Sequence, residues 1–437
     1  MRVPDTPAVP RTTLQAHEIL CPRVFTCAPG GYGPGRAAAG WLDPMKDFVR
    51  TWFPTAADYP ASRLFSLDVL RGLDMLLLTV VGPLVRALQG AFACFPASFM
   101  GQFSHGWVCF TLWDIIMPLF IFMCGAAMPF ALGRRLREGR GVFWRRVLSR
   151  VALLWAMGGL VQGNWAEFNP GTFSPFANTL QSIAVGYLAT AALMAVPSRA
   201  LSVAAPFACA FVYTALLAWG GDYTKTGNFA FKVDHAILSA LLPADNPYVA
   251  KPSHYTWFLT SLMFAAMTMC GYQAAMLLRT AWTKRVKALA LFGYAAGLFA
   301  LGGIASIWIP VIKPIYTLSF TALAMGWCVL ALAVLYVACD IFLFRRGTAL
   351  VLLFGQGALA AYFVSHFFRA PLRSVAETVL KGAMRLVDKD TAGFLVALAV
   401  AVELVAVVAL WRAFKAMRAG TGRGDAALRH ACTKQDL

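Results

Sequence analysis

The chain has 437 residues, of which 59% are hydrophobic and 13% are charged, and its mean hydropathy is +0.65. This composition excludes a soluble globular protein and predicts an all-α, polytopic transmembrane helix bundle. The net charge of +18 would suit a nucleic-acid-binding protein, but the basic residues cluster in short loops between apolar runs. We therefore interpret the charge as topology information and expect membrane lipid, and no nucleic acid, as a partner.

The first 62 residues are rich in Pro, Gly, Ala and Arg and contain no apolar run long enough for a signal peptide. They predict a disordered N-terminal extension over 1–62. Met45 begins a more ordinary sequence and is an alternative start. A membrane domain is expected over 63–415, followed by a basic cytoplasmic tail over 416–437.

Ten apolar runs follow the extension, each close to the length that crosses a bilayer as a helix. They cover residues 67–88, 112–132, 146–162, 179–196, 201–219, 256–278, 287–308, 316–339, 348–367 and 392–413. Ten spans put both termini on one side, where the loops and the C-terminal tail carry 20 Lys and Arg against 10 in the opposite loops. The positive-inside rule then predicts cytoplasmic termini, and we expect a multi-pass protein of the inner membrane.

The first apolar run carries Asp68, Arg71 and Asp74, which are three residues apart and share one helical face. Charges inside an apolar segment face the bundle interior and neutralise one another. One interpretation is a structural ladder of ion pairs that docks this helix. The other is that Arg71 is partly free to meet an anionic ligand that enters from the cytoplasm.

The second run is preceded by His105, whose imidazole exchanges protons near neutral pH. Thr111 and Asp114 have capping-box spacing, which predicts a helix that begins at Leu112 with His105 in the loop just outside. A solvated loop histidine is the plain alternative. The catalytic hypothesis makes His105 a base or acyl carrier and has Asp114 shape its loop.

A dense basic patch follows this run, at Arg134, Arg135, Arg137, Arg140, Arg145 and Arg146. Such patches commonly only fix the orientation of the chain. The alternative is a phosphate-rich cofactor, because guanidinium groups pair with phosphate oxygens.

The loop 163–178 combines aromatic, amide and acidic side chains, among them Asn164, Trp165 and Glu167, which suit sugar rings. Trp165 also fits an interfacial membrane anchor. Lys313 adds a cation in another outer loop. No spacing of His, Cys, Asp or Glu supports a metal site, so we expect no metal. Cys94 and Cys109 are the two cysteines that could meet outside the membrane.

Four stretches in consistent order resemble motifs of the transmembrane acetyltransferase family of heparan-alpha-glucosaminide N-acetyltransferase, in its bacterial branch. They are Arg63 to Met75 (RLFSLDVLRGLDM), His105 with Thr111 to Gly125 (TLWDIIMPLFIFMCG), Asn178 to Tyr187 (NTLQSIAVGY) and Ile309 to Phe320 (IPVIKPIYTLSF). The resemblance runs from about Arg63 to Trp411. Its first two motifs are the specific ones.

The resemblance implies an acetyl-CoA-dependent acetyltransferase. Such an enzyme moves acetyl from cytoplasmic acetyl-CoA across the membrane to an amino or hydroxyl group of a glycan or amino sugar. His105 would correspond to the family's catalytic histidine, either through an acetyl-histidine intermediate or as a base. We expect Arg71, Arg134, Arg135 and Arg137 to assist the cofactor. The acceptor would be contacted by Asn164, Trp165, Glu167 and Lys313. The sequence leaves open whether the chain forms a homo-oligomer.

Two other functions remain open. A solute transporter predicts several buried polar groups at mid-membrane depth, whereas most polar residues here lie near the two surfaces. A catalytically inactive scaffold of the same fold is the other. The scaffold hypothesis is suggested by two departures from the resembled family. Gly82 stands where many members have Asn, and Ser182 stands where Arg is usual.

Overall fold

The computed structural model describes residues 64–162, 165, 168–250 and 255–432, and within these ranges the regular structure is helical, with no strand. The predicted extension over 1–62, with Met45, lies outside the described residues. Asn164 and Glu167 also lie outside them. The all-α prediction is confirmed for the described part of the chain.

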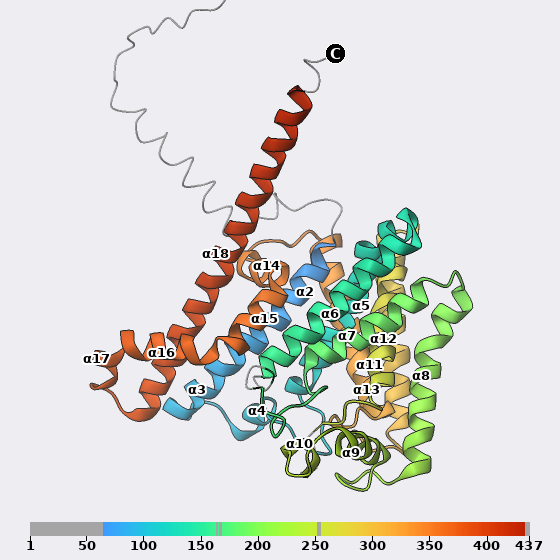
Figure 1. Ribbon diagram of the computed structural model, residues 1–437, viewed down its shortest axis with the longest axis horizontal. Helices are drawn as coiled ribbons and strands as arrows, with labels where there is room; N and C mark the ends of the chain where they lie inside the picture. Colours follow the sequence, from blue (N-terminus) through green and yellow to red (C-terminus); the bar gives the residue numbers. More distant parts are fainter. Residues whose placement is uncertain (1–63, 163–164, 166–167, 251–254, 433–437) are drawn as a thin grey trace, which may run out of the picture. The chain divides into compact units, whose positions relative to one another are not determined.

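The helices follow one another with short connections at one end of the bundle and longer ones at the other (Figure 1). The first part of the described chain forms α2 (Phe65–Leu76), the π-helical η2 (Leu77–Val81), α3 (Gly82–Phe92), α4 (Ala97–Gly101), α5 (Leu112–Glu138), α6 (Arg140–Gln162), α7 (Thr179–Met194) and α8 (Arg199–Gly220). The remainder forms α9 (Phe229–Leu241), α10 (Pro247–Ala250), α11 (Ser261–Leu278), α12 (Lys284–Ala305), α13 (Leu318–Leu335), the π-helical η3 (Tyr336–Ile341), α14 (Ala349–Gln356), α15 (Ala358–Phe367), α16 (Arg369–Val379), α17 (Lys381–Met384) and α18 (Lys389–Cys432).

Seven helices in the described ranges are long and apolar enough to cross a membrane, or eight if the bent pair α14 and α15 counts as one span. All ten apolar runs fall on helices, but the helices of two runs, α6 and α7, are not both long and apolar enough to count as spans. The arginines of α6 leave only a short uncharged stretch, and α7 has 16 residues. The chain is therefore a helical, multi-pass membrane-type bundle. Ten spans and cytoplasmic termini stay predictions.

The bundle is built around α5 and α11, which pack along each other and are largely buried. Around this pair lie α7, α8 and α13, and α12 covers α13 on the outside. On the other side α2 packs against α14, and α3 packs against α18. The large apolar side chains of α8 and α18 mostly face outward, as expected for helices in contact with lipid.

The two ends of the bundle differ in their connections. Figure 1 shows α4, α9, α10, α16 and α17 at the end where α3 finishes, while the long α18 extends from that end past the start of α2. Since α5 has 27 residues, its ends lie about 39 Å apart at 1.5 Å per residue. The loop of His105 and the patch beginning at Arg134 are thus at opposite ends of one helix.

The last helix, α18, crosses the predicted boundary between the membrane domain over 63–415 and the tail over 416–437. Helix α18 continues without a break to Cys432, so the described part of the tail predicted over 416–437 is helical. Residues 433–437 lie outside the described ranges.

Candidate active site

The first turn of α5 is closed as the spacing predicts. Leu112 is its first residue, and Thr111 and Asp114 form the capping box. The Thr111 amide donates to Asp114 Oδ2 at 3.0 Å. The next two amides are also satisfied, because Leu112 and Trp113 donate to the side-chain and backbone oxygens of Gln102 at 3.1 and 2.9 Å. This fixes the loop between Gln102 and Thr111 against the helix end.

The same carboxylate organises a three-residue cluster. His105 Nδ1 lies 2.6 Å from Asp114 Oδ1, and Lys313 Nζ lies 3.2 Å from the same oxygen. Asp114 and Lys313 are almost completely buried, with 1% and 5% of their side chains exposed, whereas 41% of the His105 side chain is exposed. A buried ion pair therefore holds one edge of an imidazole whose other edge is open.

The geometry determines the tautomer of His105. An ionised carboxylate only accepts hydrogen bonds, so the Nδ1 atom facing Asp114 at 2.6 Å must carry the proton. Lys313 Nζ is 3.4 Å from Nδ1, but it directs its hydrogen bond to the carboxylate because a protonated nitrogen cannot accept one. In the neutral imidazole the lone pair is then on Nε2, the nitrogen that does not face Asp114.

Cys109 lies beside this cluster, but its surroundings do not favour a role as a nucleophile. Its Sγ is 3.8 Å from Asp114 Oδ2. Burial raises the pKa of the Cys109 thiol, and the Asp114 charge adds to the effect. Because the thiolate is the reactive form, this environment disfavours an acyl-cysteine. Cys94 and Cys109, the two cysteines that the sequence suggests could meet, are both free thiols in this structure.

Lys313 reaches the cluster from the connection between α12 and α13. The Tyr316 amide donates to the Lys313 carbonyl at 2.9 Å, and Tyr316 has a positive φ of 46°. Thr317 closes the turn, because its Oγ1 accepts the Ile312 amide at 3.1 Å and donates to the Pro310 carbonyl at 2.9 Å. Burial lowers the pKa of the Lys313 ammonium, and the nearby Asp114 carboxylate opposes this shift.

Residues of the connection between α8 and α11 lie beside the cluster and the loop of His105. The Trp107 indole donates to the Tyr223 carbonyl at 3.0 Å, and Lys225 lies 5.8 Å from the centre of the Trp107 ring. The Tyr255 ring lies 5.9 Å from Lys313 Nζ, and burial raises the pKa of its hydroxyl to about 12. The described residues of this connection therefore contact both the loop of His105 and Lys313.

Of the acceptor-binding residues predicted in the loop 163–178, the structure describes Trp165. Its indole donates to the Ser174 carbonyl at 3.0 Å, and its ring packs on Phe173. The amide of Asn246 joins this loop to the α9–α10 segment through the Pro170 and Phe173 carbonyls at 3.0 and 2.9 Å. Trp165 is thus held by its own loop, and both its sugar-binding role and its anchor role stay predictions.

A cavity of about 640 Å³ lies between α2, α5, α6, α7 and the bent pair α14–α15. Arg71 and Arg150 line it. Along α5 its lining runs from Ala131 to Phe120, so it stops about 9 Å short of Asp114 at 1.5 Å per residue. Arg150 is not among the arginines of the predicted basic patch, but its position on α6 makes it part of the cavity lining.

The predicted charge ladder of the first helix forms only in part. Arg71 Nη1 pairs with Asp68 Oδ1 at 2.9 Å. Asp74 is 2% exposed and neither of its carboxylate oxygens has a hydrogen-bond partner among the described residues. Arg71 therefore combines both interpretations, because it pairs within its own helix and also lines the cavity.

The other predicted cofactor arginines lie beyond the cavity at the end of α5. Arg134 and Arg135 pair with Glu138 at 2.9 and 2.8 Å and are largely exposed. Arg137 lies on the same last turn. These three do not line the cavity, so a cofactor role for them means contact at its surface.

Gly82 and Ser182, the two residues that differ from the motifs that the sequence resembles, have clear structural surroundings. A Cβ at position 82 would come 2.1 Å from the Trp113 ring, so Gly82 leaves room for the Trp113 side chain as it is placed against α3. Ser182 is fully buried in the first turn of α7. The third motif is structural there, because Asn178 and Gln181 form the capping box of α7.

Among the described residues no group of three or more His, Cys, Asp or Glu could hold a metal ion. Compared with known proteins, the chain matches no protein-family model and no curated protein sequence. Any function assigned to the site therefore depends on the chemistry of the clustered residues themselves.

Proposed function

We propose that this chain is an inner-membrane acetyltransferase, with its termini in the cytoplasm, that passes acetyl from acetyl-CoA to an amino or hydroxyl group of a glycan outside. The observation that carries the proposal is the His105–Asp114–Lys313 cluster, in which a buried carboxylate orients an accessible imidazole. A nucleophile or base oriented by a third group is the general arrangement for acyl transfer.

The imidazole can serve in either of two ways. In the first, His105 Nε2 attacks the thioester carbonyl, the carbon–sulfur bond breaks and CoA leaves as the thiol after taking a proton. The acceptor amine or hydroxyl then attacks the acetyl-imidazole, the bond between the carbonyl carbon and Nε2 breaks, and the acceptor's proton passes to solvent, which replaces the proton that CoA took. In the second, Nε2 takes the acceptor's proton while the acceptor attacks acetyl-CoA directly; the carbon–sulfur bond breaks, and CoA leaves as the thiol after taking that proton back from Nε2. In both, Asp114 stabilises the positive charge that develops on the ring.

The donor would use the cavity at the basic end of the bundle. CoA carries several phosphate charges, and Arg71 and Arg150 line that cavity while Arg134, Arg135 and Arg137 lie beyond it. The thioester end would then have to cover the roughly 9 Å along α5 that separates Phe120 from Asp114. Acetyl-CoA is the implied donor, and no metal is required by this chemistry.

His105→Ala tests the proposal. Purified full-length protein in liposomes, given radiolabelled acetyl-CoA and glucosamine, should form labelled product. The variant should lose about 100-fold or more of the rate, the usual contribution of an acid–base group. His235→Ala is the matched control, because His235 is exposed on α9 and should retain the wild-type rate. An unchanged rate in His105→Ala would contradict the assignment.

A second measurement addresses the donor cavity. Replacing Arg71 and Arg150 together by Gln removes two cations from the cavity lining. The KM for acetyl-CoA should rise about tenfold or more, because each charge-assisted hydrogen bond to phosphate contributes about 1.5 kcal/mol or more. Arg199→Gln changes an exposed arginine at the same end of the bundle and should leave KM unchanged. Equal KM values in the two variants would exclude the cavity as the donor site.

A further inference from the structure

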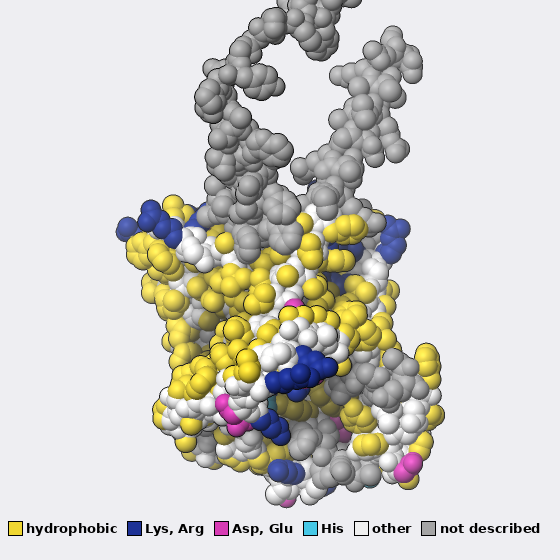
Figure 2. All heavy atoms as spheres, turned by 90° about the vertical axis from the view of Figure 1, so that its left-hand side faces the viewer, with side chains coloured by type: hydrophobic (Ala, Val, Ile, Leu, Met, Phe, Trp, Pro, Cys, Tyr) yellow, Lys and Arg dark blue, Asp and Glu magenta, His cyan; other side chains and the backbone are white. Residues whose placement is uncertain are grey.

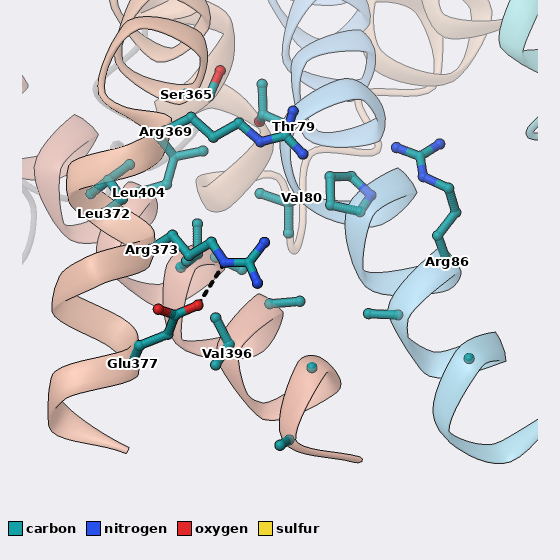
Figure 3. Close-up of a pocket in the computed structure, with 18 of the residues that line it drawn as sticks. Thr79, Val80, Arg86, Ser365, Arg369, Leu372, Arg373, Glu377, Val396 and Leu404 are labelled. Atoms are coloured by element: carbon teal, nitrogen blue, oxygen red, sulfur yellow. Dashed lines mark hydrogen bonds and ion pairs between the residues drawn. The ribbon is translucent and has the colours of Figure 1, made fainter. Parts of the chain in front are cut away.

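A second and larger cavity, of about 1100 Å³, lies at the His105 end of the bundle between α3, α15, α16 and α18 (Figure 3). It is separate from the donor cavity, and His105, Asp114 and Lys313 do not line it. The side chains of Arg369 and Arg373 extend from α16 toward α3 in Figure 3.

The lining divides into an apolar wall and a cationic mouth. The wall is formed largely by small and branched apolar residues of α18, including Val396, Ala397, Ala401 and Leu404. The mouth has four basic side chains against two carboxylates, a surplus of two positive charges: Arg86, Arg369, Arg373 and Lys389 against Glu377 and Asp390.

The arginines of the mouth differ in their partners. Arg373 pairs with Glu377 at 2.7 Å. Arg86 and Arg369 pair with no carboxylate among the described residues, and their like charges act on each other across the mouth. Arg86 is held in place, because its guanidinium lies 4.8 Å over the Trp113 ring. Two guanidinium groups whose like charges act on each other are mutually unfavourable until an anion binds beside them.

The depth of the cavity matches one leaflet of a bilayer. On α18 the lining runs from Lys389, where the span begins, to Leu404, which is about 22 Å at 1.5 Å per residue. Half of a bilayer with its headgroup region is also about 20 to 22 Å thick. Figure 2, which views the side where α16 to α18 lie, shows basic side chains bordering a hollow in a largely apolar face.

We propose that this cavity binds an anionic phospholipid from the leaflet at the His105 end, with its phosphate between Arg86 and Arg369 and its acyl chains along α18. The charge of the mouth selects an anionic headgroup, and the apolar wall selects chains rather than a free anion. This is a binding site in its own right and holds whether or not the chain transfers acetyl groups.

The test uses the detergent-purified full chain, titrated with phosphatidylglycerol and followed by native mass spectrometry. Arg86→Gln with Arg369→Gln should weaken binding about tenfold or more, the effect of losing charge-assisted contacts to a phosphate. The matched control is Arg385→Gln, because Arg385 is exposed at the same end but does not line the cavity. It should bind phosphatidylglycerol as the wild type does.

A third variant separates the lipid from a free anion. Ala397→Phe fills the apolar wall without changing charge and should also weaken phosphatidylglycerol binding. Zwitterionic phosphatidylcholine should bind the wild type more weakly than phosphatidylglycerol does. Equal binding of the two lipids, or unchanged binding in the double arginine variant, would overturn the proposal. Inorganic phosphate that displaces phosphatidylglycerol and binds Ala397→Phe as tightly as the wild type would assign the site to a free anion instead.

Discussion

On the proposed function, Asp114→Asn is expected to slow acetyl transfer about 100-fold or more, since it removes the group that sets the tautomer of the His105 imidazole. The carboxylate accepts from His105 Nδ1 at 2.6 Å and from Lys313 at 3.2 Å through one oxygen. An amide offers one acceptor oxygen and two N–H donors, so it cannot serve both His105 and the capping of Thr111. The rate of labelled glucosamine formation measures the loss.

The same change also threatens stability, and a double variant separates the two effects. Lys313 is 5% exposed, and a buried charge without its partner destabilises a protein by about 3 to 5 kcal/mol. Asp114→Asn with Lys313→Met removes both charges and should recover thermal stability while the rate stays low. Recovery of the rate together with stability would show that Asp114 acts only in folding. Asp245→Asn, an exposed carboxylate in the α9–α10 connection, should change neither property.

Local spacing is enough to predict the entrance to the site. The three-residue interval between Thr111 and Asp114 gives the start of α5 at Leu112, and His105 then lies in the loop outside. A capping box depends only on neighbours along the chain, so the sequence contains it in full. The pairing of His105 with Asp114 is also short-range, because nine residues separate them.

The third member of the cluster requires the fold. Lys313 is 208 residues from His105 along the chain, and nothing local distinguishes a lysine that is buried beside a carboxylate from one that is solvated. Its apolar neighbours and the turn closed by Thr317 are visible in the sequence, but their packing partner is not. The sequence therefore indicates a cation in this connection without predicting that it pairs with Asp114.

The run over 348–367 shows what hydropathy alone does not predict. Hydropathy predicts one helix over 348–367, whereas the structure bends this run by 79° between α14 and α15, beside Gly355 and Gly357. A Cβ at position 355 would come 2.0 Å from the Asp68 carbonyl, so this glycine allows α14 to approach α2 closely. Periodicity detects apolar faces, but it does not detect close backbone contact between helices that are distant in sequence.

A contact of this kind also joins the two central helices, and it positions the helix that carries Asp114. A Cβ at Gly125 of α5 would come 1.8 Å from the Thr268 carbonyl of α11. A Cβ at Gly271 of α11 would come 1.9 Å from the Phe122 carbonyl of α5. Small residues that let two backbones touch in this way are characteristic of helix contacts in membranes.

Gly125→Ala is therefore expected to lower the free energy of unfolding by about 3 kcal/mol, at the upper end of overpacking costs, because a backbone carbonyl cannot rotate away. The matched control is Gly293→Ala on α12, where a Cβ would meet nothing within 4 Å. That change should stabilise the protein by up to about 1 kcal/mol, the difference in helix propensity. Unfolding of the purified protein, followed by circular dichroism, measures both. Equal stability of the two variants would show that α5 and α11 are not in backbone contact, and the position of Asp114 would then need another support.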